Sequence, residues 1–261
     1  MKKNLLNQGG IMKLTKSILA LATAITISGS AFAQTVTFPT NPVIGVLGAS
    51  FSTCQAPKNS PLAGVGLAGC SYEGIYESLI KDNKIVKNDY RVETTALGGG
   101  YSYDVPQTGW TGLATQYADM KARTSWFDGI QRLKAIVIST VNDCLHTNPC
   151  TRAEMESVLI QNTQNVINTA LSQNVDVYVV GYPEWSDLNF TLAAQVYGLT
   201  NTIGQADYNY LKTKYKNVIS AIPGVVFLNS WKNNFSSFDG LHPSAQNTRK
   251  TAKEIGKLVT Q

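Results

Sequence analysis

The chain has 261 residues, of which 43% are hydrophobic and 15% are charged, the ordinary balance of a globular protein with a sizeable core. The formal net charge is +5, but residues 1–33 hold four lysines and no acid, so the rest of the chain carries +5 − 4 = +1. This near-neutral charge implies no cationic surface for nucleic acid.

The first predicted element is a secretory signal peptide over residues 1–33. A short basic stretch after Met12 precedes an apolar run, Ser17–Ile27, and Ala31-Phe32-Ala33 supplies a cleavage site. The run is too short for a transmembrane helix. We therefore expect export to the periplasm or out of the cell, without stable membrane insertion. Met1 and Met12 both remain possible starts.

Residues 34–261 are expected to form a single α/β domain. Five apolar runs predict buried strands, and the stretches between them have helical spacing. Thr151 and Glu154 make a capping box at the start of the clearest helix. This alternation predicts a parallel sheet covered by helices on both faces. The predicted strands are Val43–Leu47, Arg91–Leu97, Ala135–Val141, Val175–Tyr182 and Val225–Asn229, and the predicted helices are Glu73–Lys81, Gly112–Leu133 (with a break), Thr151–Ser172, Gln205–Ile219 and Ser244–Val259.

Four cysteines are expected to form two disulfides, because an exported protein folds where disulfides persist. Four cysteines allow three pairings. Cys54–Cys70 with Cys144–Cys150 is favoured, since each pair then closes a short loop. A structural zinc site is the disfavoured alternative, because the sequence contains no C-x-x-C pair and no cluster of histidines.

Ligands of open parallel sheets bind beyond the carboxyl ends of the strands, and three predicted strand ends carry notable residues. Ser50 follows a glycine after the first strand, where a tight turn would expose its hydroxyl. Gly98-Gly99-Gly100 follows the second strand and offers bare backbone N–H groups to an anion. Asn142 follows the third strand and can donate a hydrogen bond to an oxyanion. Taken singly, Ser50 and the glycines are better explained as loop or turn residues, and Asn142 has the same alternative.

The fourth notable segment is Phe238-Asp239-Gly240-Leu241-His242-Pro243-Ser244, after the last predicted strand. The spacing of Asp239 and His242 around a glycine lets the carboxylate reach one imidazole nitrogen, leaving the other free to accept a serine proton. Pro243 suits the first turn of the final helix. An ordinary turn is the alternative for this segment alone. Together, the four segments supply the parts of one acyl-transfer site.

These segments resemble the SGNH hydrolases, also called the GDSL family, over nearly the whole of residues 34–261. The resemblance implies that Ser50 is the nucleophile, with Asp239 and His242 completing a triad. It also implies an oxyanion hole formed by Ser50, Gly100 (or Gly99) and Asn142. Two family positions differ, since Ala49 replaces an acidic residue and Thr140 a glycine. The family fold is a three-layer, flavodoxin-like α/β/α sandwich, which agrees with the five-stranded parallel sheet predicted above.

The resemblance implies a secreted serine esterase that hydrolyses short-chain or O-acetyl esters without a metal or other cofactor. Small-molecule, carbohydrate and lipid esters are all open as substrates, and no nucleic acid is expected. A catalytically idle glycan-binding or adhesion module on the same fold is the alternative function. Tyr101, Trp185 and Trp231 are among the aromatic residues that can line a cleft or pack in the core, and His146 is expected to lie in a solvated loop. The oligomeric state is left open.

Overall fold

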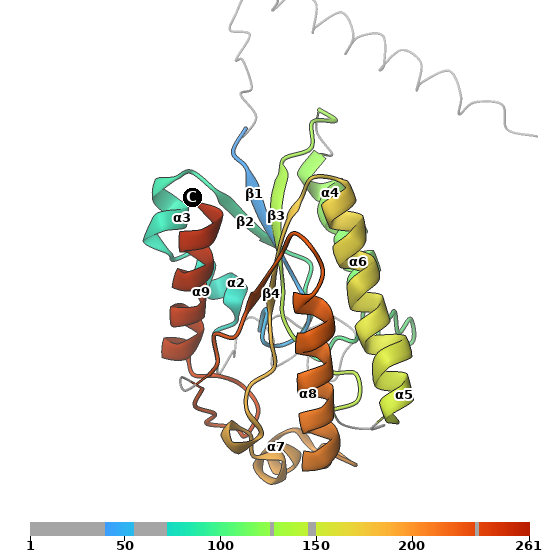
Figure 1. Ribbon diagram of the computed structural model, residues 1–261. Coiled ribbons are helices and arrows are strands. Elements are labelled where there is room, and N and C mark those ends of the chain that lie inside the picture. Colours follow the sequence, from blue (N-terminus) through green and yellow to red (C-terminus); the bar gives the residue numbers. More distant parts are fainter. Residues whose placement is uncertain (1–39, 55–71, 126–127, 146–149, 233–234) are drawn as a thin grey trace, which may run out of the picture. The chain divides into compact units, whose positions relative to one another are not determined.

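The computed structural model describes residues 40–54, 72–125, 128–145, 150–232 and 235–261 (Figure 1). The described residues belong to one compact unit, Thr40–Gln261. The predicted signal peptide, residues 1–33, lies outside the described residues.

Five strands form a fully parallel sheet in the order β2-β1-β3-β4-β5. All five residues of strand β1, which lies between β2 and β3, are buried, and this explains why its sequence is an unbroken apolar run. The predicted fold class, a five-stranded parallel sheet between helices, is confirmed. The strands are β1 (Val43–Leu47), β2 (Arg91–Thr94), β3 (Leu133–Ile138), β4 (Asp176–Val180) and β5 (Val225–Leu228).

The predicted strands are in the right places, but most run too far toward the carboxyl end. β3 ends at Ile138 although Val141 is buried, and β4 ends at Val180 although Tyr182 is buried. Residues that leave the sheet here still pack into the core from the loops. The apolar run therefore follows burial, and burial does not distinguish a strand from a buried loop.

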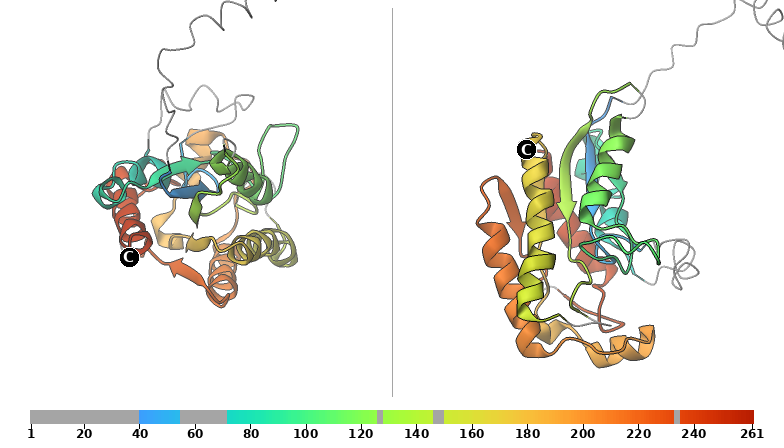
Figure 2. Two further views of the ribbon diagram at one scale, coloured as in Figure 1. Left: turned by 90° about the horizontal axis from the view of Figure 1, so that it is seen from above. Right: turned by 90° about the vertical axis from the view of Figure 1, so that its right-hand side faces the viewer.

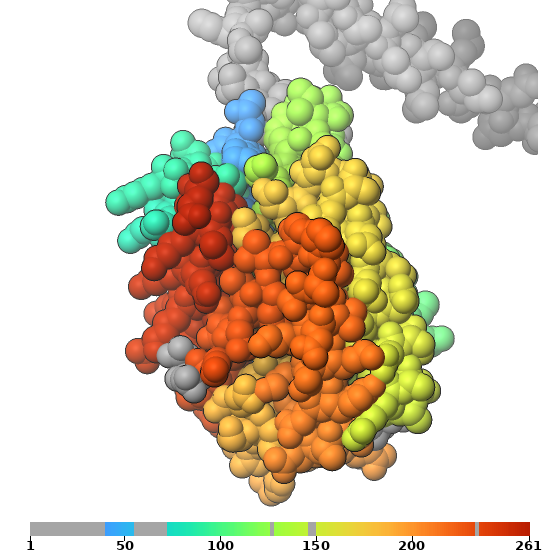
Figure 3. All heavy atoms as spheres, in the orientation of Figure 1, coloured from blue at the N-terminus to red at the C-terminus, as the bar shows by residue number. Residues whose placement is uncertain are grey.

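Helices cover both faces of the sheet. α2, α3 and α9 pack together on one face, while α4, α6 and α8 lie on the other (Figures 1 and 2). Figure 3 shows side chains of α6, α8 and α9 covering the sheet in this view. The bounds are α2 (Ile75–Leu79), α3 (Asn83–Lys87), α4 (Leu113–Ser125), α6 (Gln161–Ser172), α8 (Gln205–Ser220) and α9 (Ala245–Val259).

The long helix predicted from Thr151 contains a change of winding. Thr151 and Glu154 form the predicted capping box, and α5 (Arg152–Glu154) continues into a π-helix, η1 (Met155–Ile160), before α6. The prediction over Gly112–Leu133 was too long, because α4 ends at Ser125 and Leu133 begins β3. Three short helices were not predicted, because fewer than three turns leave little periodicity to detect. These are α3, η2 (Trp185–Asp187) and α7 (Phe190–Tyr197).

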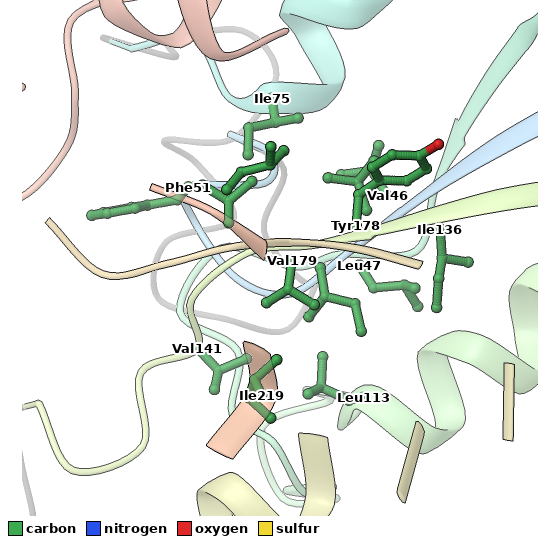
Figure 4. Close-up of a cluster of buried hydrophobic side chains, with 14 of the residues drawn as sticks. Val46, Leu47, Phe51, Ile75, Leu113, Ile136, Val141, Tyr178, Val179 and Ile219 are labelled. Atoms are coloured by element: carbon green, nitrogen blue, oxygen red, sulfur yellow. The ribbon is translucent and has the colours of Figure 1, made fainter. Parts of the chain in front are cut away.

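The hydrophobic core reaches the loops at the carboxyl edge of the sheet. Phe51 and Val141, which lie beyond β1 and β3, join the same buried cluster as Leu47 and Val179 (Figure 4). The loops that follow these strands are therefore anchored by burial. Among the helices in the described ranges, none is both long and apolar enough to cross a membrane.

Candidate active site

The segments that follow β1, β2 and β3 lie side by side at the carboxyl edge of the sheet. The Ala49 N–H donates to the Thr140 carbonyl (3.2 Å), and the Asn142 N–H donates to the Gly100 carbonyl (2.9 Å). These loops meet because β1 lies between β2 and β3. The structure thus brings the segments of Ser50, Gly100 and Asn142 together, although they are far apart in sequence.

A constrained turn precedes Ser50. Gly48 has a φ of 121°, and a Cβ there would lie 2.9 Å from Ser52 Oγ and 3.0 Å from Ser139 Oγ. The side chain of the fully buried Gln116 hydrogen-bonds both backbone groups of Gly48. It accepts from the Gly48 N–H (2.8 Å) and donates to the Gly48 carbonyl (3.2 Å). Ser52 is also buried and hydrogen-bonds Ser139 (2.6 Å), so it braces the turn. Sequence reasoning missed Gln116, because nothing in its helical surroundings marks this contact.

Asp239 and His242 form a buried pair in the loop before α9. His242 Nδ1 lies 2.9 Å from Asp239 Oδ2, while Asp239 Oδ1 accepts the backbone N–H groups of Leu241 (2.9 Å) and His242 (2.8 Å). The carboxylate therefore organises the loop and orients the imidazole at the same time. Both residues are less than 5% exposed.

The environment keeps Asp239 ionised. Burial alone would raise the pKa of Asp239, but hydrogen bonds from His242 and Tyr197 and the attraction of the His242 charge outweigh burial and hold that pKa well below its usual range. An ionised carboxylate favours the imidazole tautomer with its proton on Nδ1. His242 Nε2 is then the basic atom, and it is buried without a hydrogen-bond partner in the described part of the chain.

The residue after Ser50, Phe51, packs against His242. The Phe51 ring meets the imidazole edge-on, with 5.9 Å between ring centroids, and it also packs against Trp231. Within the described residues no hydrogen bond joins Ser50 Oγ to His242 Nε2. Hydrogen bonds between a nucleophile and its base often tighten only when substrate is bound. The structure therefore places the two segments next to each other without a hydrogen bond between Ser50 and His242 among the described residues.

A tyrosine that the sequence did not reveal covers the imidazole. The Tyr72 ring stacks on His242 with 4.0 Å between centroids and 2° between planes, and its hydroxyl donates to the Thr53 carbonyl (3.4 Å). Burial, followed by the negative charges of Glu77 and Asp239, raises the pKa of Tyr72 and keeps its hydroxyl neutral. This contact joins distant segments, so no local pattern predicts it.

The three predicted oxyanion donors differ in whether they already make a hydrogen bond. In the described ranges, neither the Ser50 N–H nor the Asn142 side-chain amide donates to a protein acceptor. The Gly100 N–H donates to the Leu97 carbonyl (2.9 Å) in a turn in which Gly99 has a φ of 81°. Two donors are therefore available as they stand, and the third is occupied.

Asp143 braces the segment that contains Gly100. Its two oxygens accept the Ser102 N–H (2.5 Å) and the Ser102 hydroxyl (2.6 Å), and Asn162 of α6 donates to the same hydroxyl (3.0 Å). Burial raises the pKa of Asp143, and the Ser102 hydrogen bonds offset part of that rise. This network ties the loop after β2 to the loop after β3 and so fixes the spacing between Gly100 and Asn142.

Because the family resemblance implies that Asn142 is an oxyanion donor, we expect Asn142→Ala to lower kcat for ester hydrolysis by about 10²–10³-fold. The fold should be retained, because the amide makes no hydrogen bond within the described residues. Steady-state kinetics and circular dichroism would measure the two effects, with Asn88→Ala at the exposed end of α3 as the control. Turnover equal to that of the control would remove Asn142 from this role.

Gly240→Ala is expected to destabilise the loop that holds Asp239 and His242. Gly240 has a φ of 86°, and a Cβ there would lie 2.2 Å from the Asn189 carbonyl oxygen and 2.8 Å from Ala193 N. The strain and the clash should lower the free energy of unfolding by about 2–4 kcal/mol. Urea denaturation would measure this loss.

The control for this stability prediction is Gly204→Ala. A Cβ at Gly204 would have no atom within 4 Å, and its φ is −78°. We expect a loss below about 1 kcal/mol for this variant. Equal stability of Gly240→Ala and Gly204→Ala would show that the close approach to α7 is not required.

The Cys144–Cys150 disulfide is formed, as predicted, with an S–S distance of 1.95 Å. It begins two residues after Asn142. Cys54 is also disulfide-bonded, but its predicted partner Cys70 lies outside the described residues, as does His146. In the described ranges, no three His, Cys, Asp or Glu side chains gather in a way that could hold a metal ion.

A groove of about 1020 Å³ lies along α7 and reaches Ser237, at the start of the loop that carries Asp239 and His242. Trp185 lies in this groove, where its ring stacks on Phe190 with 5.3 Å between centroids. Trp231, another tryptophan considered for a cleft, is only 1% exposed and packs in the core. The remaining lining is mainly neutral and polar, including Ser186, Asn189, Thr191, Gln195, Asn201, Thr202 and Gln205.

The sequence matches no model of a known protein family and no curated protein. The fold, in contrast, is similar to several solved structures. A carbohydrate acetylesterase from Sinorhizobium meliloti has a TM-score of 0.59 at 15% identity, covering 84% of this chain and 98% of that one. An aryl esterase of M. smegmatis has a TM-score of 0.57 at 15% identity, with the same coverage of both chains.

A GDSL-like lipase from Bacteroides thetaiotaomicron is similar over 91% of this chain and 96% of that one, with a TM-score of 0.52 at 12% identity. The similarity covers nearly the whole length of each of these three proteins. The chain therefore has the fold of GDSL-type esterases and lipases, as the sequence motifs implied.

Proposed function

We propose that this protein is a serine esterase that hydrolyses carboxylic esters of short acyl groups, including O-acetyl esters. The buried Asp239–His242 pair carries the proposal, since His242 Nε2 has no hydrogen-bond partner among the described residues and lies beside the segment of Ser50. The shared fold with esterases supports the same class of reaction.

In the proposed acylation step, Ser50 Oγ attacks the acyl carbonyl carbon while His242 Nε2 takes the hydroxyl proton. The carbonyl oxygen becomes an oxyanion, to which the Ser50 N–H and the Asn142 amide donate. Gly100 is the third proposed donor, and this role requires its N–H to leave the Leu97 carbonyl. The C–O bond to the alcohol then breaks, and His242 gives its proton to the departing oxygen.

Deacylation repeats these roles with water as the nucleophile. His242 takes a proton from water, whose oxygen attacks the acyl-enzyme carbonyl. The bond to Ser50 Oγ breaks, His242 returns the proton to that oxygen, and the carboxylic acid leaves. Asp239 remains ionised throughout and stabilises the imidazolium. Within this proposal no step uses a metal or another cofactor.

The test is hydrolysis of p-nitrophenyl esters of increasing chain length by the chain from Gln34 onward, together with labelling by a fluorophosphonate. We expect the highest kcat/KM with acetate and covalent labelling of Ser50. Hydrolysis that favours long acyl chains would contradict the short-chain proposal. No hydrolysis and no labelling would favour the alternative function, a glycan-binding or adhesion module.

We also propose that the protein is exported. The Cys144–Cys150 disulfide supports this proposal, because disulfides persist in oxidising compartments. The signal-like segment, residues 1–33, supports it independently. Fractionation of cells that express the full chain would test it, with loss of residues 1–33 and recovery outside the cytoplasm as the expected result.

A further inference from the structure

Both ends of helix α7 are tied to the loop that carries Asp239 and His242. At the start of the helix, the Asn189 N–H donates to the Gly240 carbonyl (2.8 Å). At its end, the Tyr197 hydroxyl donates to Asp239 Oδ2 (2.6 Å). The helix stops immediately after Tyr197, because Gly198 takes the left-handed conformation with φ 65°. These two hydrogen bonds hold α7 against the loop, with Tyr197 next to Asp239 and His242.

The Tyr197 hydroxyl reaches the carboxylate oxygen that faces the imidazole. Asp239 Oδ2 accepts both the Tyr197 hydroxyl (2.6 Å) and His242 Nδ1 (2.9 Å). The hydroxyl is the donor, because an ionised carboxylate can only accept. The phenol oxygen also lies 3.3 Å from His242 Nδ1, and the two rings meet edge-on at 5.6 Å and 82°. The hydroxyl thus lies where Asp239 and His242 touch each other.

We propose that Tyr197 is a positioning residue that sets the basicity and orientation of His242 through Asp239, an inference that rests on the esterase function proposed above. A hydrogen bond to Oδ2 stabilises the negative charge on that oxygen and weakens its attraction for the imidazolium. It also restrains the carboxylate against rotation. The restrained carboxylate in turn orients the imidazole and keeps Nε2 directed away from Asp239.

Among the described residues, three titratable side chains contact His242. Asp239 lies on its own loop, Tyr197 on α7, and Tyr72 stacks on the ring from the segment before α2. Glu77 of α2 faces Tyr72. A change confined to the Tyr197 hydroxyl leaves the remaining groups in place, so any shift in the titration of His242 reports on this hydroxyl.

The test is Tyr197→Phe, which keeps the ring and removes the hydroxyl. The chain has only two histidines, so NMR can follow the His242 imidazole after assignment with His146→Gln. The titration midpoint of His242 should rise by about 0.5–1 pH unit, because the carboxylate then attracts the imidazolium more strongly. The acidic limb of kcat/KM for p-nitrophenyl acetate should move in the same direction. In addition, kcat should fall by about 10-fold, with little change in KM.

Tyr117→Phe is the matched control. The Tyr117 hydroxyl of α4 donates to Gln173 (2.9 Å) and contacts neither Asp239 nor His242, so its removal should leave the midpoint unchanged. Tyr197→Met supplies a second variant without the hydroxyl, should the phenylalanine variant fold poorly. A midpoint that is unchanged or lower than in the control would overturn the proposal, even with a reduced melting temperature.

The NMR measurement separates this inference from the proposed function. A wild-type protein that neither hydrolyses esters nor reacts with a fluorophosphonate would contradict the esterase, while the midpoint of His242 would still test Tyr197. An active wild type with no shift in Tyr197→Phe would contradict the role of Tyr197 alone.

Discussion

Ser50→Ala is expected to abolish ester hydrolysis, lowering kcat for p-nitrophenyl acetate by about 10⁴-fold or more, because alanine offers His242 no oxygen to activate. The variant should fold normally, since in the described ranges the Ser50 hydroxyl bonds no other protein group. Stopped assays at high enzyme concentration would measure the residual rate, and mass spectrometry would show whether fluorophosphonate labelling is lost.

Ser52→Ala provides a control from the same turn. The buried Ser52 hydroxyl bonds the Leu47 carbonyl (2.5 Å) and Ser139 (2.6 Å), so its removal should lower the melting temperature but preserve labelling of Ser50. Retained hydrolysis in Ser50→Ala, or loss of labelling only in Ser52→Ala, would show that Ser50 is not the nucleophile.

Asp239→Asn is expected to lower kcat by about 10³–10⁴-fold, because an uncharged amide stabilises the imidazolium poorly and leaves the imidazole tautomer unspecified. The change should also destabilise the fold. In the wild type, hydrogen-bond donors face both carboxylate oxygens of Asp239. In the asparagine variant, the NH₂ group therefore faces a donor in either orientation of the amide. The free energy of unfolding should fall by about 1–3 kcal/mol. The five donors are the Leu241 N–H, the His242 N–H, Ser237 Oγ, the Tyr197 hydroxyl and His242 Nδ1.

The pH dependence of stability gives a second readout for Asp239. Its pKa is lowered on folding, so its stabilising contribution is present above the unfolded value of about 3.9 and is lost as the pH falls below it. The difference in unfolding free energy between wild type and Asp239→Asn should therefore be largest near neutral pH and shrink in acid. Urea denaturation at several pH values would measure it. Asp176→Asn, which removes an exposed carboxylate paired with Lys134 (3.3 Å), serves as the control.

The sequence predicted the sheet because strands of a parallel sheet that are buried on both faces appear as continuous apolar runs. β1 is buried along its whole length and appears as the unbroken run Val43–Leu47. A cap gave one helix start equally well, since the side chain of Thr151 accepts a backbone N–H only a few residues ahead. Local hydrogen bonds and regular burial are encoded in neighbouring residues, so a single sequence is enough to find them.

The candidate site was predicted in part for the same reason. The Asp239–His242 contact spans three residues and follows from local turn geometry. The three segments that carry Ser50, Gly100 and Asn142 were located by the rule that strand ends meet at one edge of a parallel sheet. What these segments do to one another, including the occupation of the Gly100 N–H by the Leu97 carbonyl, depends on turn conformations that the sequence does not specify.

The sequence by itself determined the parallel α/β architecture and the order of its strands along the chain. It also favoured the Cys144–Cys150 pair and supplied the residues proposed for catalysis. Only the tertiary structure decided which distant side chains hold those residues in place. Gln116 at Gly48, Tyr72 on His242 and Tyr197 on Asp239 all act across large separations in the chain. Such contacts depend on how helices and loops pack against the sheet, and packing constrains the size and polarity of a contacting side chain without marking it in its local sequence.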